Sequence, residues 1–124
     1  MIDKKEIGRL GEDIAVNYLK SKGYKILARN FEKRIGSMKF GEIDIIVRKD
    51  KVIVFCEVKA LSSEKGFSPE QKVGFRKQET IAKTAQIWLD EQGKEQDMPW
   101  QIDVLAIVLN FKTRRAEIKH FKNI

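Results

Sequence analysis

The sequence has little cysteine and no long apolar run, and these absences exclude several classes of protein. It has one cysteine in 124 residues, so it cannot form an intramolecular disulfide. Its N-terminus, MIDKKEIGRL, lacks the apolar core of a signal peptide. The longest apolar run, residues 102–109, is interrupted by Asp103 and is too short to span a bilayer. We therefore expect a soluble protein of a reducing compartment, the cytoplasm, with no membrane partner.

Common catalytic motifs are also missing. Zinc-binding patterns, glycine-rich phosphate loops and Ser-His-Asp arrangements are absent or impossible with one histidine and one cysteine. We interpret Cys56 as a core thiol and expect no catalytic role for His120. The chain has no repeats and no low-complexity segment, and its length suits one domain, residues 1–124.

The charge of the chain is one-sided. The net charge is +7 and the pI is about 9.5, and a field of this size captures polyanions. Nucleic acid is the commonest polyanionic partner, because phosphate contacts release condensed counterions. The basic residues recur in segments 29–39, 72–83 and 112–122. Lys39, Arg76 and Lys77 are candidate phosphate contacts; the alternative is that these side chains only keep the protein soluble.

Hydrophobic periodicity predicts two helices. The first spans residues 4–22, with Asp3 as N-cap and Gly23 as stop, and its apolar stripe includes Ile7, Leu10 and Ile14. The second follows the capping-box pattern of residues 68–71, or starts at Arg76 if Gly74 delays it, and ends at Gln92.

Five strand-like segments complete the pattern. We predict strands at the following ranges: 24–31, 42–48, 52–60, 101–109 and 114–122. A loop rich in glycine and lysine is expected over 32–41, and a tight hairpin over 49–51. The continuous apolar run at the start of segment 52–60 is typical of a central strand buried on both faces. The order α-β-β-β-α-β-β predicts an α/β fold, a mixed sheet flanked by two helices.

Three charged residues interrupt the apolar strands. Asp44 lies within GEIDIIV, and Glu57 and Lys59 lie within VIVFCEVKA. Residues two apart on a strand share a face, and counting out from the hairpin puts Asp44 near Glu57. A carboxylate pair beside an ammonium can hold a divalent cation and its water. The alternative is a buried ion pair of Glu57 with Lys59, kept for specificity.

The pattern of an Asp, a hairpin and E-x-K resembles the PD-(D/E)XK nuclease superfamily. The surrounding GRLGEDIAVNYLKSKGYKILARNF, FCEVKA and WQIDVLAI resemble the bacterial YraN-like family of predicted endonucleases, related to archaeal Holliday junction resolvases. This resemblance covers nearly the whole chain. It implies a restriction-endonuclease-like αβββαββ core and Mg²⁺-dependent hydrolysis of phosphodiester bonds in DNA, including branched DNA such as Holliday junctions.

The resemblance also implies roles for individual residues. Asp44 and Glu57 would bind Mg²⁺, for which Mn²⁺ would substitute, and the backbone carbonyl of Val58 would be a further ligand. Lys59 would orient or help to deprotonate the attacking water. Glu12 matches the first-helix glutamate that completes the metal site; the alternative is a solvated surface residue.

Other features leave alternatives open. Gln78 lies on the inner stripe of the second helix, where it either faces the active site and binds phosphate or water, as in some superfamily members, or fills a core gap. Asp103 matches a recurring family aspartate, which we interpret as structural. Segment 32–41 looks longer than the usual family link.

Two rival functions are a non-catalytic nucleic-acid-binding module on the same scaffold and a protein-interaction domain. A homodimer would suit cuts in two opposite strands.

Overall fold

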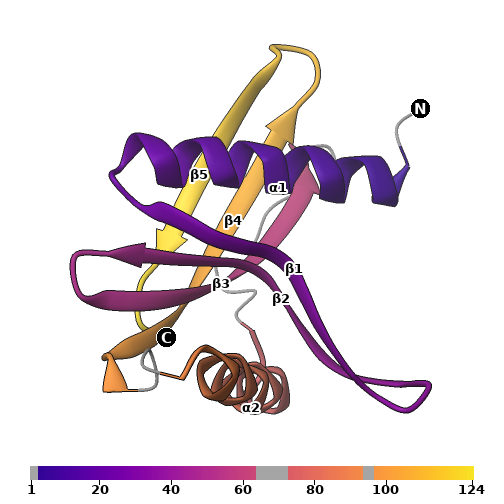
Figure 1. Ribbon diagram of the computed structural model, residues 1–124. Helices are drawn as coiled ribbons and strands as arrows, with labels where there is room; N and C mark the ends of the chain where they lie inside the picture. Colours follow the sequence, from indigo (N-terminus) through magenta and orange to yellow (C-terminus); the bar gives the residue numbers. More distant parts are fainter. Residues whose placement is uncertain (1–2, 64–72, 94–96) are drawn as a thin grey trace.

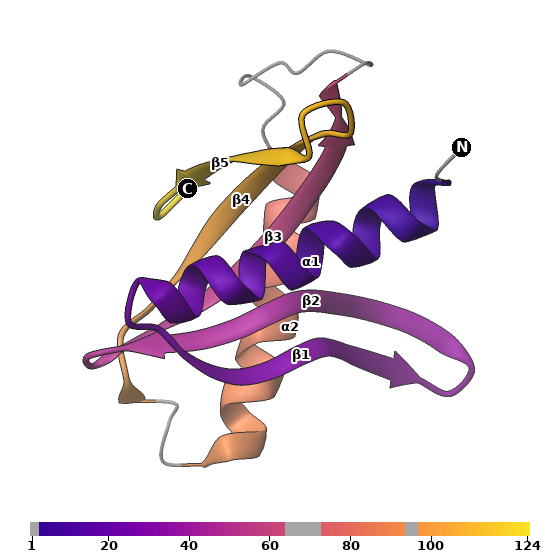
Figure 2. The ribbon, with the colours of Figure 1, turned by 90° about the horizontal axis from the view of Figure 1, so that it is seen from above.

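The computed structural model describes residues 3–63, 73–93 and 97–124. Its elements, in chain order, are α1 (Lys4–Ser21), β1 (Lys25–Ile35), β2 (Met38–Lys49), β3 (Val52–Ser62), α2 (Phe75–Gln92), β4 (Trp100–Asn110) and β5 (Arg115–Phe121). The strands form one sheet in the order β1-β2-β3-β4-β5, in which only the β3–β4 pairing is parallel among the described strands. The two helices lie on opposite faces of this mixed sheet (Figures 1 and 2). The αβββαββ order is confirmed and is consistent with a restriction-endonuclease-like fold. In the described part of the chain, no helix combines the length and apolar content needed to cross a membrane.

Helix α1 begins and ends close to where the sequence predicts. The Asp3 carboxylate accepts a hydrogen bond from the Glu6 backbone N–H at 2.9 Å, which satisfies one of the free donors of the first turn. Gly23 follows the helix with φ of +90°, a conformation that favours glycine. Gly11, Ala15 and Leu19 are buried against the sheet.

Helix α2 covers the other face. It begins at Phe75, with Gly74 as N-cap, so the delayed start is the alternative that the structure supports; the capping-box pattern at 68–71 lies outside the described residues. Ile81 and Leu89 are buried against the sheet, and Trp88 packs edge-on against Phe55 with ring centroids 5.8 Å apart. The helix ends at Gln92, as predicted.

Strand β3 is central, as its apolar run predicts. Residues 53–56 are buried, and alternate side chains enter two separate cores. Ile53 and Phe55 pack on the α2 side, whereas Val54 and Cys56 pack on the α1 side. Burial, with the charges of Asp103 and Asp44, raises the pKa of the Cys56 thiol. Because odd-numbered residues point toward α2, the strand carries Glu57 to that side.

The predicted loop over residues 32–41 is wrong. Strands β1 and β2 continue through this segment as a two-stranded ribbon, in which Ile35 pairs with Met38 across a turn at residues 36–37. Gly36 has φ of +64°, which permits so tight a turn. Near its tip, both faces of the ribbon are exposed to solvent. Its sequence therefore lacks the regular alternation that identifies a half-buried strand.

A hydrogen-bonded network ties α1 to the last two strands. His120 Nε2 lies 2.7 Å from Oδ2 of Asp103, which is fully buried, and the Tyr18 hydroxyl lies 3.0 Å from His120 Nδ1. Oδ1 of Asp103 accepts hydrogen bonds from Gln101 Nε2 and from the Asn123 backbone N–H. Burial by itself would raise the pKa of Asp103, but these hydrogen bonds outweigh burial and lower it.

The closest helix-to-sheet approach provides a stability test. A Cβ at Gly11 would overlap the Cβ of Ala60 on β3, whereas a Cβ at Gly8 would meet nothing within 4 Å. We expect Gly11→Ala to destabilise the fold by about 2 kcal/mol because the helix must move away from β3. The matched control, Gly8→Ala, should stabilise the fold by about 0.5 to 1 kcal/mol through helix propensity. Urea unfolding measures both, and an equal gain in stability for the two variants would contradict the close contact.

Candidate functional site

The candidate site lies where β2 and β3 separate. Their ladder ends at the Ile45–Cys56 pair, and beyond it β2 stays with β1 while β3 continues beside β4 (Figures 1 and 2). At the point of separation the Asp44 carboxylate accepts a hydrogen bond from the Val58 backbone N–H, with Oδ2 2.8 Å from the nitrogen. A side chain thus replaces the strand that would otherwise bind this N–H, and the hydrogen bond holds the Asp44 carboxylate against β3.

Glu57 lies beside Asp44, as counting from the hairpin predicts. Its side chain is only 12% exposed. Burial, followed by a hydrogen bond with Asp44 and by the negative charge of Asp44, raises the pKa of Glu57 to about 8. At neutral pH, burial and the adjacent Asp44 therefore favour the protonated form of Glu57.

Two lysines flank this carboxylate pair. Lys77 Nζ, from α2, lies 3.5 Å from Glu57 Oε2, and this contact partly offsets the rise in the pKa of Glu57. The sequence predicts a phosphate contact for Lys77 and does not predict this ion pair. Its position four residues before the buried Ile81 was a signal that Lys77 points toward the sheet.

Lys59 is half-buried on β3, two residues beyond Glu57 and therefore on the same face of the strand. Within residues 3–63, 73–93 and 97–124, no hydrogen bond or ion pair is found for its ammonium group. An ion pair of Glu57 with Lys59, the alternative to a metal site that the sequence leaves open, is thus not formed, and Glu57 pairs with Lys77 instead. A partly buried ammonium without such a partner is costly, and a bound anion or water would reduce that cost.

Glu12 approaches the pair from α1. Its side chain is 22% exposed, and burial and then the charge of Asp44 raise its pKa. Arg29, whose guanidinium nitrogen lies 4.0 Å from a Glu12 carboxylate oxygen, and the side chain of Asn30 oppose that rise. The negative charges of Glu12 and Asp44 therefore act on each other.

The oxygen atoms of the Asp44 and Glu57 side chains are of the chemical type that binds a hard divalent cation. Asp44 and Glu57 offer carboxylate oxygens, which Mg²⁺ prefers, and a cation would relieve the repulsion that now keeps a proton on Glu57. Across the described residues, however, no three acidic, histidine or cysteine side chains are gathered closely enough to form a complete metal cluster. The chain thus provides a carboxylate pair, with Glu12 nearby.

For three other candidate site residues, the described part of the chain shows no contact with the Asp44–Glu57 pair. The Gln78 amide nitrogen donates to the backbone carbonyl of Val73 at 2.8 Å. Lys39 pairs with Glu42, with Nζ and Oε1 3.0 Å apart. Arg76 is exposed at the start of α2, one residue before Lys77.

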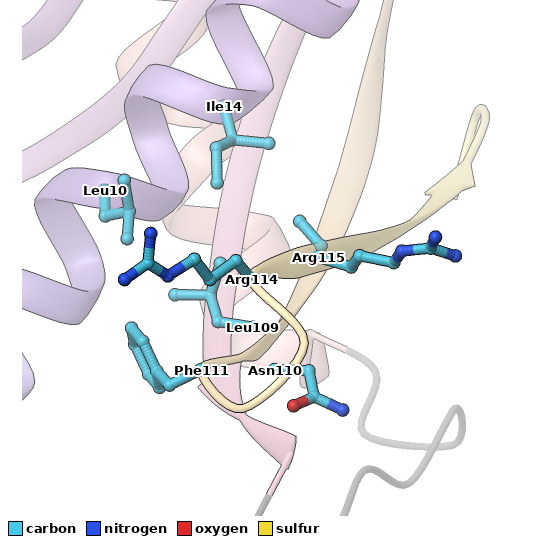
Figure 3. Close-up of a pocket in the computed structure, with 8 residues that line it drawn as sticks. Leu10, Ile14, Leu109, Asn110, Phe111, Arg114 and Arg115 are labelled. Atoms are coloured by element: carbon cyan, nitrogen blue, oxygen red, sulfur yellow. The ribbon is translucent and has the colours of Figure 1, made fainter.

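An apolar hollow of about 290 Å³ (Figure 3) has none of the candidate site residues in its lining. It lies between α1 and the turn joining β4 to β5, and its lining residues are Leu10, Ile14, Leu109, Asn110, Phe111, Arg114, Arg115 and Ala116. Leu10 and Ile14 are each two residues from Glu12, and therefore on the other side of the helix. The hollow has no carboxylate in its lining, so the carboxylate pair is the better candidate for chemistry.

Comparison with known proteins identifies relatives along the whole chain. Residues 11–107 match the model of the family described as "Uncharacterised protein family UPF0102". A UPF0102 protein of Clostridium botulinum is 41% identical over 119 residues, which cover 96% of this chain and 93% of the relative. A UPF0102 protein of Caldanaerobacter subterraneus subsp. tengcongensis is 38% identical over 98% of this chain and 96% of the relative.

The raised pKa of Glu57 predicts a cost in stability. A carboxyl group whose pKa is higher in the folded state supports folding fully below its unfolded pKa and loses that contribution as pH rises through the folded value. In EDTA, we expect Glu57→Gln to match the wild type below about pH 4.5 and to exceed it by about 1 to 3 kcal/mol at about pH 9. Urea unfolding across this range measures the difference. Glu117→Gln, at an exposed position on β5, is the control, and a wild type as stable as Glu57→Gln at high pH would contradict the crowding of carboxylates.

Proposed function

The chain belongs to the UPF0102 family, and we propose that it is a metal-dependent endonuclease that hydrolyses phosphodiester bonds in DNA. The proposal rests on one observation: Asp44 and Glu57 are crowded together, mostly out of water, at the point where the sheet divides. Crowding of this kind costs stability, and a cation-dependent activity would account for it. The order of an Asp, a hairpin and E-x-K is also that of the PD-(D/E)XK superfamily, and the αβββαββ order agrees with that assignment.

Asp44 and Glu57 would hold Mg²⁺, or Mn²⁺ in its place, with the Val58 carbonyl and Glu12 as further ligands. A bound ion of this kind lowers the pKa of water and stabilises negative charge on a phosphoryl group. Val58 contributes in a second way, because its N–H fixes the Asp44 carboxylate on β3. The site is thus preorganised by the backbone at the residue that separates Glu57 from Lys59.

The lysines have separate tasks in this proposal. Lys59 has no ion-pair partner within the described residues, so its ammonium group is available to orient the attacking water and to favour its deprotonated form. Lys77 is exposed on one side and reaches Glu57 on the other, which suits a contact to a phosphate oxygen beside the scissile bond. Arg76 and Lys39 would bind phosphates farther along the strand, where contacts position the duplex without reading its sequence.

The net charge of +7 supports a polyanionic substrate. Among DNA substrates, branched forms such as Holliday junctions are included on the resemblance to archaeal resolvases, and a homodimer would suit paired cuts. The proposal places the protein in the cytoplasm, where such DNA is found in bacteria.

The decisive experiment compares cleavage with binding. Labelled single-stranded, duplex, flap and four-way DNA is incubated with the protein and Mg²⁺, Mn²⁺ or EDTA. We expect cutting only with metal, and Glu57→Gln and Asp44→Asn should each lower the rate by about a thousandfold. DNA binding in EDTA should be retained, because affinity comes from dispersed lysines and arginines. Glu117→Gln, which removes an exposed carboxylate of β5, should cut as the wild type does.

Two results would replace the proposal with a rival. Binding to DNA without metal-dependent cutting of any of the four forms would favour a non-catalytic nucleic-acid-binding module. An absence of both cutting and binding would favour a protein-interaction domain. Full cutting by a folded Glu57→Gln protein would remove the carboxylate pair from the chemistry.

Lys59→Ala separates water activation from metal binding. Since Lys59 is assigned to the water, we expect single-turnover cleavage at saturating metal to fall about a hundredfold. The affinity for Mn²⁺, measured by isothermal titration, should change little. Lys51→Ala, an exposed lysine in the β2–β3 turn, is the matched control. A large loss of Mn²⁺ affinity with an unchanged rate would show that the roles are assigned wrongly.

A further inference from the structure

The β1–β2 hairpin extends well beyond the rest of the sheet. We define the arm as residues 31–43, the part of the hairpin that follows the last β2–β3 pair at Ile45. Within the described residues, strand pairing in the arm involves only β1 and β2. Figures 1 and 2 both show the arm running away from β3, with its turn at the far end.

The tip of the arm is apolar. Ile35 and Met38 are cross-strand partners on either side of the turn, and they are 65% and 75% exposed. Two large apolar side chains held together in water at the most distant point of a ribbon are unfavourable for an isolated protein. A partner that covers them would remove that cost.

The base of the arm is fixed on α2. Gly41 lies so close to Thr84 and Thr80 that it leaves no room for a Cβ, and Lys33 Nζ lies 2.8 Å from Glu91 Oε2. Residues 34–39 then project beyond these contacts. The direction of the arm is therefore set by packing at its base, and its tip is presented at a defined position relative to Asp44.

Charge favours a polyanion as the partner. The chain carries a net charge of +7, and the arm itself contains three basic residues, Lys33, Arg34 and Lys39, and two acidic residues, Glu32 and Glu42. The Arg34–Glu32 and Lys39–Glu42 ion pairs are exposed. Exposed pairs contribute little, so phosphates can compete for these cations. Basic side chains around an apolar tip suit nucleic acid, in which phosphates surround stacked bases.

We propose that the arm is a second nucleic-acid contact, which inserts Ile35 and Met38 between stacked bases. This inference rests on the proposed function. From Asp44 to Met38 the extended chain spans about 20 Å at about 3.3 Å per residue. That length corresponds to about six base pairs of a duplex. Apolar side chains that enter a base step unstack it and kink the duplex. We therefore expect the bound duplex to be distorted about six base pairs to one side of the scissile bond.

Insertion of the arm favours some DNA substrates over others. Unstacking has an energetic cost, which is smallest where bases are already mismatched or unpaired. Duplexes with an unpaired or flexible step at that distance should therefore bind more tightly than regular duplexes. Junctions and flaps supply such steps.

The test uses 2-aminopurine, a base whose fluorescence rises when it is unstacked. Duplexes that carry it at successive positions are mixed with the full chain in EDTA, and metal-dependent cutting maps the scissile bond in parallel. We expect fluorescence to rise about threefold at a step about six base pairs from the cut. The double variant Ile35→Ser/Met38→Ser should lose this rise and bind a regular duplex about tenfold more weakly. It should still cut a duplex in which that step is already unpaired. Ile124→Ser, at an exposed apolar position near the C-terminus, is the matched control.

The outcomes separate this inference from the proposed function. Wild-type protein that binds and cuts without a rise in fluorescence, or a double variant that behaves as the wild type, would overturn the arm contact while leaving the nuclease intact. Binding and a fluorescence rise without cutting would support the arm and overturn the nuclease. If sedimentation shows a wild-type dimer that the double variant abolishes, the tip contacts a second copy, and the nucleic-acid contact is overturned.

Discussion

The hydrogen bond from the Val58 N–H to the Asp44 carboxylate determines how the rest of the site is arranged. In a continuous sheet, the backbone of β2 would bind β3 at this level, and a charged side chain would have no reason to lie between the strands. Here the carboxylate takes the place of the backbone. Strand β2 is then free to leave β3 and to form the arm, while β3 continues beside β4. Asp44 thus bridges β2 and β3 just beyond their last backbone pair and supplies a carboxylate to the candidate site.

The crowding of carboxyl groups at the candidate site lowers the stability of the fold. Glu57 and Glu12 both have raised pKa values, and in each case burial is the largest cause and Asp44 contributes. Lys77 partly offsets the rise in the pKa of Glu57, and Arg29 and Asn30 partly offset the rise in the pKa of Glu12. The two apolar cores, one under each helix, offset the destabilising effect of the crowded carboxyl groups. This is the pattern expected of a site selected for binding and not for the rigidity of the fold.

Local sequence signals predicted the parts of the fold that depend on local periodicity. The stripe of α1, the continuous apolar start of β3 and the two-residue spacing of Glu57 and Lys59 all follow from geometry within one element. The sequence does not predict the arm because its tip is exposed on both sides and has no buried face to impose alternation. The Tyr18–His120–Asp103 network was missed because it joins residues about 100 positions apart on three elements. The pairing of Lys77 with Glu57 was missed for a similar reason, since it depends on where α2 crosses the sheet.

Cys56 stands next to Glu57 on β3, and its side chain points to the opposite face, into the core under α1. Burial raises the pKa of its thiol and so suppresses the thiolate, the form that reacts with oxidants and alkylating reagents. The lone thiol is therefore shielded while the sheet is closed, although it is only one residue from the most strongly perturbed carboxyl group. Its rate of alkylation reports how often the centre of the sheet opens to solvent. The native chain thus carries an internal reporter of breathing at the strand that bears the candidate site.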